Sequence, residues 1–196
     1  MGSYAYELRF DSGRICLDLV ATGVHPVEQL DCGERLTAWL AGAGLVPPDT
    51  AHPADPAWLS GFIELREYVR QLVRGEIAGR PADAALDRVN AYASGSPPAL
   101  KAVRHPDGTL VKAFAAAPDR DALLAAVARD TVDLLTDPEA RALLRQCEGD
   151  NCARLYLDTS RGHRRRWCSS EICGNRERVA RHRRRAALGA RAQVGT

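Results

Sequence analysis

Four cysteines near the C-terminus constrain the fold of this chain more than any other feature of its sequence. They form two C-x4-C pairs, Cys147 with Cys152 and Cys168 with Cys173, and fifteen residues separate the pairs. Two to four residues between paired cysteines let both thiolates reach one ion, and four thiolates complete the tetrahedral shell of a structural zinc site. Four unrelated buried thiols would be the alternative, but that reading explains neither the pairing nor the separation. The sequence therefore predicts one structural Zn²⁺ on these four cysteines.

The compartment bears on how the six cysteines are interpreted. The opening residues MGSYAYELRF lack the apolar segment of a signal peptide, and no later stretch is long and apolar enough to span a membrane. We therefore expect a cytoplasmic protein, where paired cysteines bind metal more often than they form disulfides. Cys16 and Cys32 stand apart from the pairs, and we interpret them as buried free thiols.

Charge is distributed unevenly along the 196 residues. Residues 1–146 hold 15 basic and 20 acidic side chains, whereas residues 147–196 hold 12 arginines and 5 acids. A net charge of −5 on the first part and +7 on the second indicates a basic module attached to an acidic body.

Hydrophobic spacing and turn residues predict an α+β body without internal repeats. Apolar residues recur at helical intervals, and Pro or Gly stands where helical hydrogen bonding must stop. Short apolar runs flanking Asp11-Ser12-Gly13 and Pro106-Asp107-Gly108 predict two β-hairpins. The predicted helices cover 34–44, 56–77, 81–93, 119–136 and 138–146, and the predicted hairpins cover 7–22 and 99–115.

The cysteine-rich segment is too short to bury an adequate core by itself, so we expect the metal to stabilise its fold. Residues 153–160 and 163–168 are predicted to form a hairpin that turns at 160–162. A helix then follows the second cysteine pair, and its N-terminal partial charge favours thiolates. The order of knuckle, hairpin and helix predicts a treble-clef-like zinc finger. His163 could substitute as a ligand, but the four cysteines already complete the shell.

The run CARLYLDTSRGHRRRWCSSEICGNRERVARHRRR closely resembles the CGNR zinc finger, and its name-giving tetrapeptide is Cys173-Gly174-Asn175-Arg176. The run LRFDSGRICLDLVAT at 8–22 resembles the opening of the ABATE domain, which precedes this finger in the family. The resemblance implies an ABATE-like α/β domain over 1–143 and the finger over 144–196. It also implies a stress-linked transcription regulator whose finger binds DNA. Ser170 and Arg178 stand where the family pattern leads us to expect methionine and often lysine.

Arginines of the finger are the candidates for DNA contact. On a regular helix from Ile172, the residues Ile172, Val179 and Ala186 share an apolar stripe, and Arg178, Arg181 and Arg185 lie opposite it. In an extended hairpin, Arg164 and Arg166 would share one face and Arg165 the other. Asn175 could contact a base, or it could instead cap the helix or hold the zinc loop. The full set of predicted DNA contacts is Arg164, Arg165, Arg166, Asn175, Arg178, Arg181, Arg184 and Arg185.

Three function classes remain open. The first is a DNA-binding regulator whose N-terminal domain senses an unknown small-molecule effector or partner, and whose specificity would be increased by a homodimer. The second is a protein-interaction or thiol-redox module in which oxidation releases zinc. An enzyme ranks last and we expect none, because a closed four-cysteine shell has no open position for an activated water.

Overall fold

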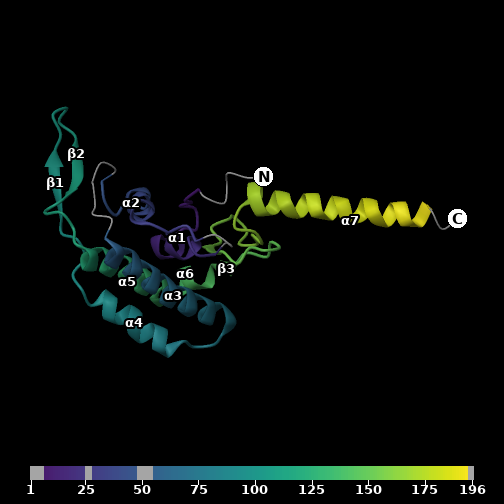
Figure 1. Cartoon of the computed structure of the whole chain (residues 1–196), viewed down its shortest axis with the longest axis horizontal. Coiled ribbons are helices and arrows are strands. Elements are labelled where there is room, and N and C mark those ends of the chain that lie inside the picture. Colours follow the sequence, from purple (N-terminus) through teal and green to yellow (C-terminus); the bar gives the residue numbers. More distant parts are fainter. Residues whose placement is uncertain (1–6, 25–27, 48–54, 194–196) are drawn as a thin grey trace.

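The computed structural model describes residues 7–24, 28–47 and 55–193, with side chains as far as Arg185. Figure 1 shows a helical body with a β-hairpin rising from one end and a long helix, α7, projecting from the other. The mixture of helices and small sheets confirms the predicted α+β class. The helices are α1 (Ile15–Ala21), α2 (Gly33–Gly42), α3 (Pro56–Ala78), α4 (Asp83–Ala93), α5 (Arg120–Thr136), α6 (Pro138–Ala142) and α7 (Asn175–Gln193), and the strands are β1 (Leu100–Arg104), β2 (Leu110–Phe114), β3 (Leu144–Gln146) and β4 (Leu155–Leu157).

Helix α3 is the central element of the body. The side chain of Asp55 accepts a hydrogen bond from the Ala57 N–H, Pro56 occupies the first turn, and Gly79 ends the helix at φ +63°. Its apolar face packs against α1, α4 and α5. The sequence predicted this helix over 56–77, and the structure confirms it. Its buried apolar residues are Phe62, Leu65, Val69, Leu72 and Val73.

Aspartates define the boundaries of the next helices. The Asp119 side chain accepts a hydrogen bond from the Ala122 N–H, 2.7 Å away, and so begins α5. Asp137 ends α5 and caps α6 through the Glu139 N–H at 2.9 Å. The predicted helices at α2, α4 and α5 are confirmed, whereas the last predicted one stops at Ala142 and continues as β3.

The predicted hairpin over 7–22 is wrong, because residues 15–21 form helix α1. A short apolar run such as Ile15–Ala21 suits a buried helix as well as a strand, and its own residues do not decide between them. A contact with α5 stabilises the helical form: the Asp130 carboxylate accepts a hydrogen bond at 2.9 Å from the N–H of Cys16 in the first turn of α1. That partner is 114 residues away in sequence.

The predicted hairpin over 99–115 is confirmed. Strands β1 and β2 pair antiparallel, with Leu100 opposite Phe114 and Arg104 opposite Leu110. Gly108 closes the turn at φ +88°, a conformation that favours glycine. Figure 1 shows this hairpin standing clear of the helical layers.

The hairpin of the finger differs from the prediction. Strand β4 lies within 153–160 as expected, but it pairs antiparallel with β3, upstream of the first cysteine pair, and residues 163–168 form no strand. Alternation along β4 directs Leu155 and Leu157 into the core of the body, whereas Tyr156 packs with the cysteines. One face of β4 therefore packs on the body and the other packs on the cysteines, so this strand joins the finger to the body.

Within the ranges that the structure describes, no helix combines the length and the apolar character needed to cross a bilayer.

Candidate metal centre and basic helix

The four paired cysteines meet at one point. Their sulfur atoms all lie within 4.8 Å of one another, with Cys152 Sγ 3.8 Å and Cys173 Sγ 3.7 Å from Cys168 Sγ. A tetrahedral shell with Zn–S bonds of about 2.3 Å has S–S edges of about 3.8 Å. The sulfur positions therefore fit one structural zinc ion, with no coordination position left over for water or substrate.

The loop after β3 positions the first pair. The Gly149 N–H points at Cys147 Sγ from 3.4 Å, and the Cys168 N–H points at it from 3.3 Å. Hydrogen bonds from the Cys152 and Cys168 thiols, together with these N–H groups, lower the pKa of the Cys147 thiol well below its usual range. A Cβ at Gly149 would lie 3.3 Å from Cys173 Cβ, so the loop passes close to the second pair. Cys147 is therefore prepared as a thiolate ligand.

A π-helical turn, Ser170–Gly174, positions the second pair. Ser169 caps it through the Ile172 N–H, and the Gly174 N–H donates to the Ser169 carbonyl at 2.9 Å. Cys173 lies inside this turn and Cys168 immediately precedes the cap, so both sulfurs lie at the N-terminal end of the helical segment that continues into α7. The sequence predicted that this position would favour negative charge on sulfur, but the hydrogen bond with Cys147 raises the pKa of Cys168 and burial raises the pKa of Cys173 to about 12.

Arg165 and Tyr156 form the inner wall of the site. The guanidinium of Arg165 lies 4.4 Å from the centre of the Tyr156 ring and donates to the carbonyls of Trp167 and Cys168. The Tyr156 hydroxyl in turn donates to the Arg165 carbonyl at 2.7 Å. Arg165 thus holds the loop that carries Cys168, and we no longer count it among the candidates for DNA contact.

Asp158, which is fully buried, organises the loop between β4 and the second pair. Its carboxylate accepts hydrogen bonds from the Ser160 hydroxyl at 2.6 Å and the Arg165 N–H at 2.8 Å. His163 adopts φ +48°, and its Nδ1 lies 2.9 Å from the Asp158 carbonyl. These contacts make His163 a turn residue, and the metal cluster in the structure comprises the four cysteines without it.

Arg154 links the finger to the body, and sequence reasoning missed it. Its side chain is only 8% exposed and forms ion pairs with Asp11 at 2.8 Å and Asp18 at 3.9 Å. Burial lowers the pKa of Arg154 and raises that of Asp18. The Arg154 guanidinium also donates to the Arg9 carbonyl at 3.2 Å. Arg154 therefore joins the N-terminal segment and α1 to the strand that follows the first cysteine pair.

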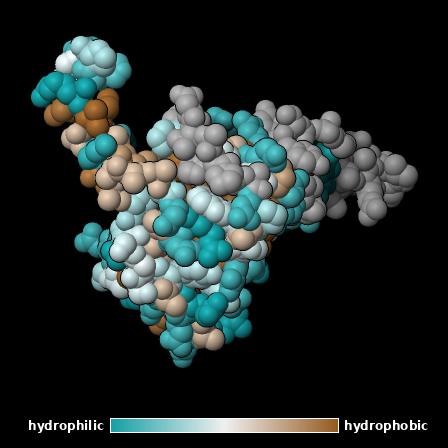
Figure 2. Space-filling model, turned by 60° about the vertical axis from the view of Figure 1, so that its left-hand side comes forward, coloured by the Kyte–Doolittle hydropathy of each residue, from teal (hydrophilic) through white to brown (hydrophobic). Residues whose placement is uncertain are grey.

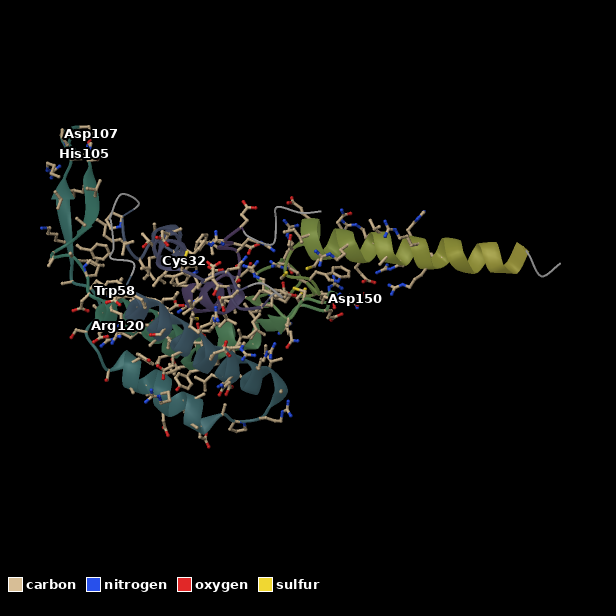
Figure 3. The ribbon with its side chains drawn as sticks, in the orientation of Figure 1. Cys32, Trp58, His105, Asp107, Arg120 and Asp150 are labelled. Atoms are coloured by element: carbon tan, nitrogen blue, oxygen red, sulfur yellow. The ribbon has the colours of Figure 1, made fainter. Side chains whose placement is uncertain are left out.

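Helix α7 begins immediately after the metal site and extends away from the body (Figure 1). Cys173, Glu177 and Ala180 line a hollow of about 220 Å³ between the helix and the first cysteine loop, which defines the inner side of α7. Asp150 lies in that loop, beside the start of the helix in Figure 3. With a turn of about 100° per residue, Arg178, Arg181 and Arg185 share a stripe along one flank of this inner side.

The predicted apolar stripe of α7 is not a buried one. Ile172 packs against the cysteines, but Val179 is 42% exposed. The π turn before α7 takes more residues per turn than the α-helix assumed in the prediction, so it shifts the angular register of everything after it. Ala186 lies beyond the side chains that the structure describes.

The other predicted contacts are distributed over the finger surface. Arg164, Asn175 and Arg178 are exposed, and Arg178 reaches the Ser170 carbonyl at 3.3 Å. Arg166 is exposed but pairs with Glu148 at 2.5 Å, and Arg184 pairs with Glu177 at 2.7 Å. Ser169 caps the helical turn, so Asn175 is not needed for that role.

Taken together, a four-thiolate metal site joined to a basic helix and built onto a helical body defines a zinc-finger protein with an accessory domain. Comparison with known protein families supports this class. Residues 13–138 match the ABATE family, described as "Putative stress-induced transcription regulator", and residues 143–186 match the CGNR zinc finger. The chain belongs to the ABATE family, as its sequence suggested. A comparison with curated protein sequences finds no match.

Proposed function

We propose that this protein is a DNA-binding transcription regulator in which the zinc site fixes helix α7 in place for contact with a duplex. The observation that carries the proposal is the stripe of Arg178, Arg181 and Arg185 on a helix anchored at one end by Cys173. These three arginines are exposed, and a zinc-stabilised base limits how far the helix can swing. The family description supports a regulatory role.

Phosphate contacts would supply most of the affinity. Arg178, Arg181 and Arg185 are assigned to the DNA backbone, and Arg164 lies exposed on the neighbouring loop. Asn175 is the candidate for reading a base edge, because it is exposed at the start of α7 and its amide can both donate and accept. Arg166 and Arg184 would have to exchange Glu148 and Glu177 for a phosphate, which makes their contribution smaller.

The helical body is assigned the regulatory input, from a small molecule or a protein partner. The finger and the body cannot move independently without cost, because Leu155 and Leu157 are part of the body's core and Arg154 is buried against Asp18. A change in the body would therefore reach the metal site through β4 and Arg154.

The test is fluorescence anisotropy of the zinc-loaded full chain on random duplex DNA across a salt series. Each phosphate contact contributes about 0.9 to the slope of log affinity against log salt. Replacing Arg181 and Arg185 with alanine should make that slope shallower by about two. The matched control replaces Arg80 and Arg141, two exposed arginines of the body, with alanine. The control removes the same net charge and should leave the slope unchanged.

Two outcomes would contradict this function. Absence of salt-dependent binding in the wild-type chain would favour the alternative, a zinc-dependent protein-interaction or redox module. Equal slope changes in both double variants would mean that overall charge, and not α7, attracts the DNA. Measuring zinc content in every sample separates either outcome from loss of the finger's fold.

A further inference from the structure

The β1–β2 hairpin is an exposed surface that the proposed function does not use. Leu100 and Leu110 are 56% and 63% exposed, and Val103 and Val111 are also exposed. Among the elements that the structure describes, β1 and β2 pack mainly against each other. Figure 2 shows the hairpin projecting from the body with a hydrophilic tip and hydrophobic residues below it, and Figure 3 places His105 and Asp107 at the tip.

An isolated two-stranded hairpin is marginally stable in water, and exposed strand edges are templates for pairing. Neither strand contains proline, and each has five residues. Among the described residues no further strand joins this sheet, so an apolar ribbon of this kind is suited to a partner that supplies further strands or an apolar cover.

The outer edge of β1 has the symmetry of a self-pairing strand. The His105 N–H donates to the Thr109 carbonyl, and the Ala115 N–H donates to the Ala99 carbonyl. Hydrogen-bonded pairs alternate in an antiparallel ladder, so odd-numbered residues of β1 bond to β2. The N–H and C=O groups of Leu100, Ala102 and Arg104 consequently point away from β2, and they are spaced symmetrically about Ala102.

Charge distinguishes the two edges of the hairpin. If β1 pairs with a second β1 about Ala102, each Arg104 lies opposite a Leu100 and each Lys101 lies opposite a Val103. No like charges then lie directly opposite one another. The corresponding two-fold pairing of β2 is centred on Lys112 and would place two ammonium groups directly opposite, which is destabilising. In the register that pairs all five residues of a strand, the β1 edge is therefore compatible with self-association and the β2 edge is not.

Side chains on one face of the sheet also gain apolar contacts from β1 pairing. On one face, Leu110 and Arg104 of one chain line up with Leu100 and Phe114 of the other. Long arginine side chains cover apolar neighbours with their alkyl stems, so Arg104 would shield the exposed Leu100 of the second chain. The product is a four-stranded antiparallel sheet, which passes the size at which sheets become independently stable.

We infer that the outer edge of β1 is a homodimer interface, in which two copies of the chain pair antiparallel about Ala102. The interface is built from two five-residue strands and is therefore smaller than the standard interface of about 1,600 Å². A reversible dimer, formed at micromolar or higher concentration, is the expected result. This inference extends beyond the proposed function and does not depend on DNA binding.

Proline substitutions test the edge without damaging the hairpin. The Ala102 N–H faces outward, so Ala102→Pro removes a donor needed for dimer pairing but none used between β1 and β2. Lys112→Pro is the matched control, since the Lys112 N–H faces outward from the β2 edge. Sedimentation velocity of the zinc-loaded full chain should show a dimer fraction that rises with concentration. Ala102→Pro should raise the dimer Kd at least about tenfold, and Lys112→Pro should leave it unchanged.

A cysteine at the symmetry axis tests the register. In a hydrogen-bonded antiparallel pair the Cα atoms lie about 5.5 Å apart, within the range of a disulfide. Ala102→Cys, in a chain where the half-buried Cys32 is serine, should form a covalent dimer under mild oxidation with zinc retained. Arg104→Cys in the same background should remain monomeric on a non-reducing gel, because residue 104 lies opposite residue 100 in this register and the two introduced cysteines would be too far apart to bond.

Three results would overturn the inference: a monomer at every concentration up to about 0.5 mM, where even weak dimers form, equal effects of the two proline variants, or cross-linking of Arg104→Cys in preference to Ala102→Cys. A monomeric chain whose DNA salt slope falls on Ala102→Pro would also overturn it, and would assign the hairpin to nucleic acid.

Discussion

The two hairpins of this protein, β1–β2 and β3–β4, are stabilised in opposite ways. The strands of β1–β2 are five residues long and largely exposed, and their pairing is nearly all that holds them. Those of β3–β4 are three residues long, but β4 is buried along its whole length. Leu155 and Leu157 contact the body's core, and Tyr156 contacts the metal site.

This contrast shows that strand length is a poor guide to what a hairpin contributes. The short hairpin joins two cores, because alternate side chains of β4 belong to different clusters. The long hairpin has no core on either face within the described chain, so its apolar side chains are available to a partner. Changes near β3–β4 should consequently affect the whole fold, whereas matched changes in β1–β2 should remain local.

Zinc removal should give the largest difference between the two hairpins. Zinc binding contributes about 10–16 kcal/mol of apparent free energy in modules that depend on it, so chelation should unfold the finger. Hydrogen exchange should then speed up at the amides of Cys147 and Leu157, which donate to the Arg154 and Ser12 carbonyls. The amides of His105 and Ala115 in the β1–β2 hairpin should exchange as before.

Acid provides a second route to the same result, since zinc ligands must be deprotonated to bind. Zinc release should therefore increase as pH falls, and added zinc should reverse it. If the Leu157 amide stayed protected from hydrogen exchange after complete chelation, the prediction would be wrong, because the body alone would then hold β4.

Arg154→Met should give the next largest effect. Removing one partner of a buried ion pair costs about 3–5 kcal/mol, and the half-exposed Asp11 places this case near 3 kcal/mol. The matched change is Arg104→Met in β1, where the guanidinium is exposed and donates to the Gly108 carbonyl. That change should cost less than about 0.5 kcal/mol. Denaturant unfolding of both variants measures the difference, and equal costs would mean that Arg154 is not a structural link.

The sequence predicted the parts of this fold whose signals are local. The Asp119 cap and the Gly108 turn each act on neighbouring residues, so α5 and the β1–β2 hairpin were predicted correctly. Helix α1 and strand β3 depend on distant partners, the Asp130 carboxylate and β4. For such short apolar segments, contacts made only in the folded chain decide between helix and strand.

In the candidate site, too, the residues with a local signal were predicted and those that depend on the folded chain were not. The spacing of the four cysteines was enough to predict that they share one site, because the two members of each pair are close in sequence. The roles of Arg154, Asp158 and Arg165 could not be predicted, since an arginine-rich segment does not reveal which guanidinium groups turn inward. The alternation in LYLD is the signal that could have found Tyr156, whose neighbours on both sides are leucines.

Truncating a leucine should also have different effects in the two hairpins, because Leu155 is buried and Leu110 is exposed. Leu155 is fully buried, so Leu155→Ala should destabilise the protein by about 2–5 kcal/mol through lost burial and a cavity. Leu110→Ala removes the same atoms from a side chain that is 63% exposed, and should change the unfolding free energy by less than about 0.5 kcal/mol in the monomer. Thermal unfolding at low protein concentration checks both values. A cost for Leu110→Ala that grows with concentration would instead report the loss of a dimer.

Two glycines provide the smallest and most closely matched test. Gly13 and Gly108 have φ values of +95° and +88°, so an alanine at either position should suffer backbone strain of about 1–2 kcal/mol. A Cβ at Gly108 would meet nothing within 4 Å, whereas one at Gly13 would lie 3.1 Å from Leu157 Cβ. Gly13→Ala should therefore cost about 1 kcal/mol more than Gly108→Ala, because β4 is held on both faces and cannot easily move aside. Denaturant midpoints of the two variants, measured with zinc bound, give the difference. If the two costs were equal, β4 could shift away from residue 13, and the buried hairpin would be less constrained than its packing indicates.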